Sequence, residues 1–167
     1  MSVSVLLDTS FLISLVNERR AHHAVAADYY RYLLTHDLPM YFSAIVAAEF
    51  GIRQAITELP LGYFRLLEFN IAHGQKAANL WNALGPRNEG DMRSVVRDDM
   101  KLLAQASHEG IPFILTEDAS TLHKHCERLR AAGRVQTRAI MLKDGFDPAA
   151  LRADGQVDWV GDSAEET

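Results

Sequence analysis

Short apolar runs alternate with amphipathic helical segments along this chain, and this alternation constrains the fold more than any other feature of the sequence. Runs of a few apolar residues suit the strands of a parallel sheet, which is covered by helices on both faces. Strands that alternate with helices predict βαβ units with right-handed crossovers. We therefore expect an α/β fold, a three-layer α/β/α sandwich around a central, mainly parallel sheet. The expected strands are residues 3–7, 40–42, 113–115 and 137–142.

Capping residues and helix formers divide the rest of the chain. Ser43 is a suitable N-cap for a following helix, and Gly110 is suitably placed to end the helix that begins at residue 93. Residues 62–67 are ambiguous, and residues 68–71 suit either a strand or the start of the next helix. The expected helices are residues 11–16, 22–34, 43–56, 72–84, 93–109 and 120–132.

The size of the chain favours one globular domain. Its 167 residues, 48% of them hydrophobic, can bury one sizeable core but are too few for two independent domains. We place a domain at residues 1–143 and expect a weakly structured, acidic tail at residues 144–167.

The sequence indicates a cytoplasmic protein. Its one cysteine, Cys126, cannot form an intrachain disulfide, which suits a reducing compartment. The N-terminus has no basic leader and Asp8 interrupts its apolar stretch, so we expect no secretory signal. The longest apolar runs are far shorter than the roughly 20 residues of a membrane-spanning helix.

Charge is unevenly distributed along the chain. The net charge of -5 argues at first against a nucleic-acid partner. Of the 22 acidic and 17 basic residues, seven acids and one base follow residue 143, which leaves 15 acids and 16 bases, a net charge of +1, in residues 1–143. If several of these acids bind a metal, the rest of the body is basic, and its charge permits binding to RNA.

Two aspartates follow strands of the predicted sheet. Asp8 ends the first apolar run, and Asp118 comes three residues after the run at 113–115. In an open parallel sheet, ligands bind beyond the carboxyl ends of the strands, where side chains and helix N-termini converge. Taken singly, each aspartate is equally well explained as a turn residue or a helix N-cap. The pair becomes informative only together with further acids.

Glu49 lies on the apolar face of the helix predicted at residues 43–56. It is three residues from Val46 and Ile52 and four from Ile45, so it shares their stripe. A carboxylate on such a stripe is costly unless it is paired, hydrogen-bonded or bound to a metal.

Asp99 faces inward on the helix predicted at residues 93–109. The apolar residues at helical spacing around it are Val95, Leu102, Leu103 and Ala106. Its neighbour Asp98 aligns instead with a set that we expect to be solvated, which consists of Arg97, Lys101 and Gln105. We therefore choose Asp99 over Asp98 as the inward acid.

Four convergent carboxylates need a cation. The alternative is a set of buried ion pairs in which Glu49 and Asp99 are each neutralised by an arginine. Oxygen ligands suit Mg²⁺ or Mn²⁺ better than zinc. A zinc site at His123, His125 and Cys126 is disfavoured, because it lacks a fourth ligand and any Cys-x-x-Cys motif.

The four acids occur in an order that resembles the PIN-domain nucleases, including the VapC-type toxins. That family has an aspartate after the first strand, a glutamate on an early helix, an aspartate near the start of a later helix, and Thr-x-Asp after the next strand. The resemblance covers residues 3 to about 142. The matching segments are Leu6-Leu7-Asp8-Thr9-Ser10, Glu49, Asp99 in Asp-Met-Lys-Leu-Leu-Ala-Gln-Ala, and Pro112-Phe-Ile-Leu-Thr-Glu-Asp118.

The resemblance implies a metal-dependent endoribonuclease that uses Mg²⁺ or Mn²⁺. It implies that Thr116 orients one of the acids with its hydroxyl, and that Ser10 helps to position the metal or a phosphate. The metal ligands and catalytic residues that it implies are Asp8, Glu49, Asp99 and Asp118.

The resemblance also implies partners. The commoner case for a small chain of this family is the toxin of a type II toxin–antitoxin pair, with an antitoxin protein as partner and frequent homodimers. A recessed acidic site favours single-stranded or looped RNA as the substrate. Arg53 lies one turn beyond Glu49 and is a candidate substrate contact; other basic residues that could flank the mouth of the site are Arg19, Arg20, Arg93 and Arg97.

The chain departs from the family pattern after Thr-x-Asp. Members often have a further acid and an aromatic there, whereas this chain has Ser120 and Thr121-Leu122, which puts a second metal ion in doubt. The acidic extension after Asp144 is also outside the pattern, and it could bind a partner or the protein's own basic surface.

Three other functions compete with the toxin interpretation. A HAD-type phosphatase also has an aspartate after its first strand, but it needs a second aspartate where this chain has Ser10. A stand-alone RNA-processing nuclease would have the same acids without an antitoxin. A non-catalytic PIN-fold module for protein binding would not need the four acids.

Overall fold

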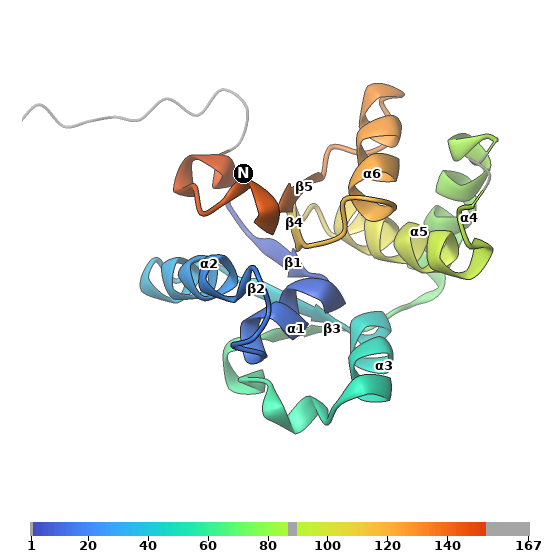
Figure 1. The fold of residues 1–167 in the computed structure, drawn as a ribbon. Helices are drawn as coiled ribbons and strands as arrows, with labels where there is room; N and C mark the ends of the chain where they lie inside the picture. Colours follow the sequence, from blue (N-terminus) through green and yellow to red (C-terminus); the bar gives the residue numbers. More distant parts are fainter. Residues whose placement is uncertain (1, 87–89, 153–167) are drawn as a thin grey trace, which may run out of the picture.

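A parallel sheet forms the centre of the computed structural model, which describes residues 2–86 and 90–152. In the described residues the strand order is β3-β2-β1-β4-β5, and every neighbouring pair is parallel (Figure 1). The α/β prediction is confirmed, and the ambiguous segment 62–71 contains the edge strand β3. The strands are β1 (Val5–Leu7), β2 (Met40–Ser43), β3 (Arg65–Leu67), β4 (Phe113–Thr116) and β5 (Arg138–Met141).

The helices begin and end close to the predicted positions. Ser43 caps α3 by accepting a hydrogen bond from the Ile45 amide at 3.0 Å. This helix ends at Arg53 rather than residue 56, because residues 56–58 form a separate 3₁₀ turn. The helices are α1 (Thr9–Val16), α2 (His23–Thr35), α3 (Ala44–Arg53), α4 (Ile71–Leu84), α5 (Arg93–His108) and α6 (Leu122–Ala131). None of the helices in the described ranges is long and apolar enough to cross a membrane.

The order of the strands places the helices on two sides of the sheet. From β1 the chain moves outward through β2 to β3, and it then returns past β1 to β4 and β5. Right-handed crossovers therefore put α1 and α2 on one side and α4, α5 and α6 on the other. The helices pack in these two groups, and α3 contacts both α1 and α5 (Figure 1).

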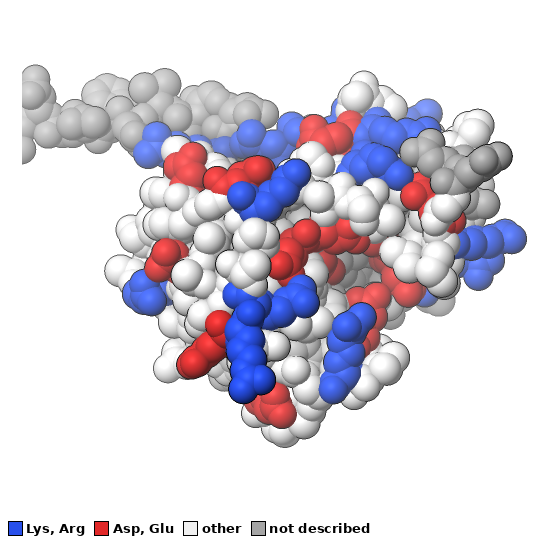
Figure 2. Space-filling view, viewed as in Figure 1, with Lys and Arg blue, Asp and Glu red and all other residues white. Residues whose placement is uncertain are grey.

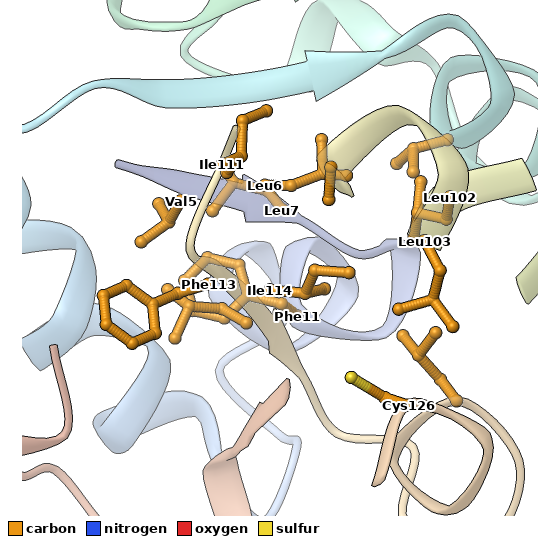
Figure 3. Close-up of a cluster of buried hydrophobic side chains, with 14 of the residues drawn as sticks. Val5, Leu6, Leu7, Phe11, Leu102, Leu103, Ile111, Phe113, Ile114 and Cys126 are labelled. Carbon is orange, nitrogen blue, oxygen red and sulfur yellow. The ribbon is translucent and has the colours of Figure 1, made fainter. Parts of the chain in front are cut away.

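The core lies against both faces of β1 and β4. The side chains of Leu6 and Ile114 are fully buried in the centre of the sheet, as are those of Phe11 from α1 and Leu103 from α5 (Figure 3). Each such side chain contributes about 1.5–3 kcal/mol by leaving water. The two central strands are therefore firmly placed, which fixes the positions of the residues that follow them.

Two expectations for α5 are wrong. Val95 is 37% exposed, while Val96 and Met100 are buried instead. Gln105, which was expected in solvent, is fully buried. The reason is that α5 is covered on more than one side, by α4, by α6 and by α3, so that its buried face is wider than one apolar stripe.

The buried amide of Gln105 joins three parts of the fold. Its Oε1 accepts a hydrogen bond from the Ser43 hydroxyl at 2.5 Å, and its Nε2 donates to the Glu68 carbonyl at 3.1 Å. These contacts connect α5 to the end of β2 and to the segment before α4, and they satisfy the polar atoms that burial has removed from water.

The described fold extends beyond the expected domain boundary at residue 143. Residues 144–152 belong to the described fold, because the Leu151 side chain is only 2% exposed and the Phe146 ring contacts Tyr29 edge-on with centroids 4.9 Å apart. The Tyr29 hydroxyl also lies 3.4 Å from the carbonyl oxygens of Gly145 and Asp147. The boundary at residue 143 is thus corrected, and the rest of the expected tail, residues 153–167, lies outside the described residues.

We predict that Gln105→Ala lowers the free energy of unfolding by about 2–4 kcal/mol. The change opens a cavity, leaves the Ser43 hydroxyl without its acceptor and removes the donor to the Glu68 carbonyl. Chemical denaturation measures the change. Gln75→Ala on the exposed face of α4 is the matched control, and equal stability of the two variants would contradict the role of this network.

Candidate metal centre

Asp8 and Asp118 lie at the same edge of the sheet. Leu7 pairs with Leu115 in the parallel register of β1 and β4, and the Asp8 amide donates to the Leu115 carbonyl at 3.1 Å. Asp118 follows the end of β4 by two residues. The carboxyl ends of the two central strands therefore bring both acids to one place, as an open parallel sheet does for its ligands.

Two hydroxyls hold the carboxylate of Asp8. Ser10 Oγ and Thr116 Oγ1 each donate to Asp8 Oδ2 at 2.7 Å. The same hydroxyls accept from the backbone, Ser10 from the Glu117 amide at 2.8 Å and Thr116 from the Asp118 amide at 2.9 Å. Burial nevertheless raises the pKa of Asp8, and the nearby charge of Asp118 adds to this increase.

Glu49 reaches the same place from α3. Its Oε2 accepts a hydrogen bond from the Thr9 hydroxyl, which directly follows Asp8. Burial raises the pKa of Glu49, and the charges of Asp8 and Asp98 raise it further, against the Thr9 hydrogen bond. The charge of Arg53, one turn along α3, acts in the opposite direction, which places this arginine near the acid as expected.

Asp99 is a strongly perturbed acid of the group. Its side chain is 13% exposed, and its Oδ2 has no hydrogen-bond partner among the described residues. Burial raises its pKa from an ordinary value of 3.8 to about 8, with further contributions from the negative charges of Asp8, Asp118 and Glu49. No ion pair in the described part of the chain joins Glu49 or Asp99 to an arginine, so the alternative of separately neutralised acids is not what the structure shows.

Asp118 is the acid that the protein itself keeps ionised. Burial alone would raise its pKa, but hydrogen bonds from Thr121 and Ser120 outweigh burial and lower it. Asp118 Oδ1 accepts from both the amide and the hydroxyl of Ser120, at 2.8 and 2.9 Å, and Oδ2 accepts from the Thr121 hydroxyl. The two residues that depart from the family pattern therefore bind the carboxylate of Asp118.

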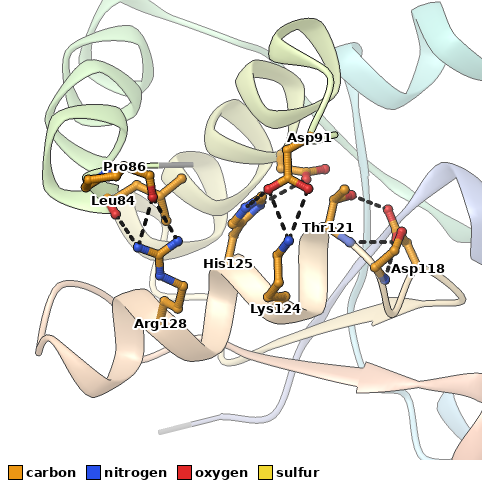
Figure 4. Close-up of polar contacts among 10 residues, drawn as sticks. Leu84, Pro86, Asp91, Asp118, Thr121, Lys124, His125 and Arg128 are labelled. Atoms are coloured by element: carbon orange, nitrogen blue, oxygen red, sulfur yellow. Dashed lines mark hydrogen bonds and ion pairs between the residues drawn. The ribbon is translucent and has the colours of Figure 1, made fainter. Parts of the chain in front are cut away.

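A polar cluster that the sequence analysis did not predict lies next to Asp99. Asp91 accepts two hydrogen bonds from Lys124 Nζ, at 3.0 and 3.1 Å, and these chiefly lower its pKa (Figure 4). The fully buried ring of His125 lies between two acids, with Nε2 at 3.4 Å from Asp91 and Nδ1 at 3.7 Å from Asp99. Burial lowers the pKa of His125 and so favours its neutral form. No periodicity could signal this cluster, because its members come from the loop before α5 and from α6.

The arginines expected at the mouth of the site are placed differently from one another. Arg20 donates to Glu117 Oε2 at 2.6 Å, and Ser14 donates to the same oxygen at 2.9 Å, which ties the loop after α1 to the end of β4. Arg93 and Arg97 lie over the ring of Trp81, 5.8 and 5.9 Å from its centroid. Arg19, like Arg53, is exposed.

Two other groups of potential metal ligands are less suitable. The Cys126 thiol donates to the Thr137 carbonyl at 3.2 Å, and burial raises its pKa to about 11, so it stays protonated and cannot act as a thiolate ligand. Potential ligand atoms of His73, His108 and Glu109 lie within 4.8 Å of one another. However, His73 Nδ1 accepts from the Asn70 amide at 3.1 Å and Nε2 contacts Glu109 at 2.7 Å, so both of its nitrogens are already used to hold the start of α4.

A hard divalent cation fits the four-acid site. Acidic side chains line a hollow in the surface, and basic side chains flank it (Figure 2). The free Oδ2 of Asp99 and the mutual repulsion of the four carboxylates are what a bound cation would relieve. Mg²⁺ usually keeps several waters and takes only one or two carboxylates directly, so it does not require the oxygens of all four acids to touch it.

Comparison with known proteins identifies the fold family. The sequence matches the PIN domain family over residues 5–127. The chain belongs to this family. The match includes all four acids of the site and excludes the HAD-type alternative. No curated protein matches the chain.

Solved structures agree with the PIN fold. FitAcB from Neisseria gonorrhoeae is similar at a TM-score of 0.57 and 15% identity, over 83% of this chain and 98% of its own. VapBC2 from Rickettsia felis, solved with a DNA fragment from its promoter, has a TM-score of 0.55 and 13% identity over 83% and 98% of the two chains. VapC20 from Mycobacterium tuberculosis, described as a Sarcin-Ricin loop cleaving toxin, has a TM-score of 0.52 and 21% identity over 81% and 99%.

We predict that Asp99→Asn stabilises the metal-free protein, and that the gain grows from pH 5 to pH 8. The pKa of Asp99 is about 8 in the folded protein and near 3.8 in the unfolded chain, so folded molecules hold a proton that unfolded molecules have lost. Stability therefore falls as pH rises through this window, at about 1.4 kcal/mol per pH unit, and asparagine removes the loss.

Thermal unfolding in a metal chelator checks this prediction. The control is Asp98→Asn, which removes an exposed carboxylate that pairs with Lys101 at 3.0 Å. A gain in stability for Asp99→Asn that is the same at pH 5 and pH 8 would contradict the prediction, because it would show that the pKa of Asp99 is not raised in the folded protein.

Proposed function

We propose that this PIN domain is an endoribonuclease dependent on Mg²⁺ or Mn²⁺, and that it is the toxin of a type II toxin–antitoxin pair. The observation that carries the proposal is the convergence of Asp8, Glu49, Asp99 and Asp118 at the carboxyl end of the sheet, with the pKa of Asp99 raised to about 8. A fold that served only to bind proteins would gain nothing from this repulsion, which costs stability.

The chain's own residues divide the work. Asp8 and Asp118 hold the metal from the ends of β1 and β4. Hydrogen bonds from Ser10 and Thr116 fix the carboxylate of Asp8. Hydrogen bonds from Ser120 and Thr121 keep Asp118 ionised. When bound, the ion lowers the pKa of a water and offsets negative charge on the scissile phosphate. Glu49 and Asp99 complete the site from two helices, and their carboxylates can accept a hydrogen bond from the attacking water.

The substrate that suits this site is single-stranded or looped RNA. Acidic side chains line a hollow in the surface, and the phosphates of an intact duplex do not enter such a hollow easily (Figure 2). Arg53 is exposed beside Glu49 and can pair with a phosphate next to the one that is cut. The description of VapC20 as a Sarcin-Ricin loop cleaving toxin supports looped RNA as the substrate class.

The toxin assignment rests on the similar structures. VapC20 is described as a toxin. VapBC2 was solved with promoter DNA, which supports a partner that binds DNA. We extend this to an antitoxin that binds the present chain, to a homodimer and to a cytoplasmic location.

We predict that Asp8→Asn and Asp99→Asn each lower the rate of RNA cleavage at least about 100-fold, since loss even of a group that orients a metal ligand costs about 10–100-fold. Thr116→Val, which removes only the hydroxyl that holds Asp8, should fall within that smaller range. Cleavage of a fluorescent single-stranded RNA in Mg²⁺ or Mn²⁺ measures the rates. The variant Asp98→Asn should stay close to the unmodified protein. Wild-type rates in Asp8→Asn, or cleavage that survives a chelator, would refute the proposal.

We predict that expression of the unmodified chain in a bacterial host arrests growth, and that expression of Asp99→Asn at the same level does not. Cleavage of cellular RNA is the physical reason, and colony counts after induction measure it. Activity in the cleavage assay without any effect on growth would instead favour a stand-alone RNA-processing nuclease. Binding of a partner protein with no cleavage at all would favour the non-catalytic module.

A further inference from the structure

A basic pocket lies at the end of the sheet opposite the four acids. Its volume is about 690 Å³, and its walls include Phe113, the first residue of β4, and Arg138, the first residue of β5. Four cationic side chains line it and no acidic residue of the described chain does. The cations, Lys76, Arg130, Arg134 and Arg138, come from α4, α6, the loop after α6 and β5.

The described chain ends beside this pocket. The Arg138 guanidinium donates to the Arg152 carbonyl at 2.8 Å, and it lies 5.5 Å from the centroid of the Phe113 ring. Arg152 is the last described residue, so a residue of the pocket wall itself holds the point from which the chain continues.

The continuation has the complementary charge. Residues 153–167 contain five acids and neither lysine nor arginine, so this segment of 15 residues has a net charge of -5. It also contains Trp159 between Asp158 and Val160, which could pack against the apolar parts of the pocket such as Val135 and Phe113. The acids are Asp154, Asp158, Asp162, Glu165 and Glu166.

We propose that the acidic C-terminal segment, residues 153–167, docks in the basic pocket of its own chain. The segment starts at the rim, and at about 3.3–3.6 Å per extended residue it is long enough to cross the pocket several times over. A single exposed ion pair contributes about 0–1 kcal/mol, so several pairs must act together with the burial of Trp159.

The covalent attachment of residues 153–167 to the chain favours this segment over a free polyanion as the occupant of the pocket. Attachment at Arg152 gives the segment an effective concentration on the order of millimolar, which no free nucleic acid of ordinary concentration matches. The docked segment would neutralise the basic face, and RNA would then be directed to the four-acid site on the other side. The proposal does not depend on the proposed nuclease activity, because no acid of the metal centre takes part.

Fluorescence of Trp159 in the full chain tests the docking. The chain has two tryptophans, so Trp81→Phe leaves Trp159 as the single reporter while keeping an aromatic ring in α4. We expect acrylamide to quench Trp159 less in this protein at about 10 mM salt than in the free peptide 153–167. At about 1 M salt, where the screening length falls from about 30 Å to about 3 Å, quenching should rise at least about twofold.

Charge reversal identifies the pocket. Lys76→Glu combined with Arg134→Glu changes two wall residues whose side chains make no hydrogen bond or ion pair within the described chain. Quenching of Trp159 should then rise to that of the free peptide. The matched control, Arg65→Glu, makes the same kind of change on the exposed edge strand β3 at the far side of the sheet.

Two results would overturn the proposal. One is quenching of Trp159 that equals that of the free peptide at low salt. The other is shielding of Trp159 that survives Lys76→Glu with Arg134→Glu, or that grows with protein concentration and so comes from contact between molecules. Unfolding curves of each variant exclude a general loss of structure as the cause.

Discussion

The pairing of β1 with β4 is the contact on which the metal centre depends. It sets Leu7 beside Leu115, so that Asp8 and Thr116 leave the two strands next to each other. The hydroxyls of Thr116 and Ser10 then hold one oxygen of Asp8, while their own oxygens accept amides of the segment after β4. A shift of one residue in this register would turn every side chain to the other face and would separate the acids. The hydrophobic burial of the central strands thus fixes the geometry of a charged site.

The four acids are stabilised unequally, and the inequality has a structural cause. Asp118 accepts hydrogen bonds from a turn that follows it and stays ionised, whereas Asp99 comes from a helix whose backbone groups are already paired. The basic group nearest to Asp99 in the described chain is the ring of His125, at 3.7 Å. Burial lowers the pKa of this ring and so favours its neutral form. Burial and three like charges outweigh the hydrogen bond with Thr121 that lowers the pKa of Asp99, and together they raise this pKa to about 8. Such a conflict between local stability and charge is typical of functional sites rather than of structural cores.

Helical phase and strand ends were sufficient to predict the fold and to nominate the four acids, because both depend on local spacing. The burial of Gln105 could not be predicted in the same way, since its side chain is held by hydrogen bonds with Ser43 and Glu68, which are distant in sequence. The contact of His125 with Asp91 and Asp99 is also nonlocal. Residues 144–152 looked like the start of a tail because of their glycine, proline and acidic residues, yet Leu151 is buried in the core. Sequence patterns predict which face of an element is buried, but not how many neighbours cover it.

The parallel sheet also explains why the net charge of the chain is a poor guide to its partners. Acids gather at the carboxyl ends of β1 and β4, while Arg138 and the other cations of the basic pocket surround the amino ends of β4 and β5. Because all strands run in one direction, these two ends are opposite poles of the molecule. Residues 1–143 have a net charge of only +1, although they contain a strongly acidic and a strongly basic face. At a screening length of about 8 Å, a ligand responds to the face that it approaches and not to the sum of both. A small net charge is therefore compatible with binding a cation at one pole and an anion at the other.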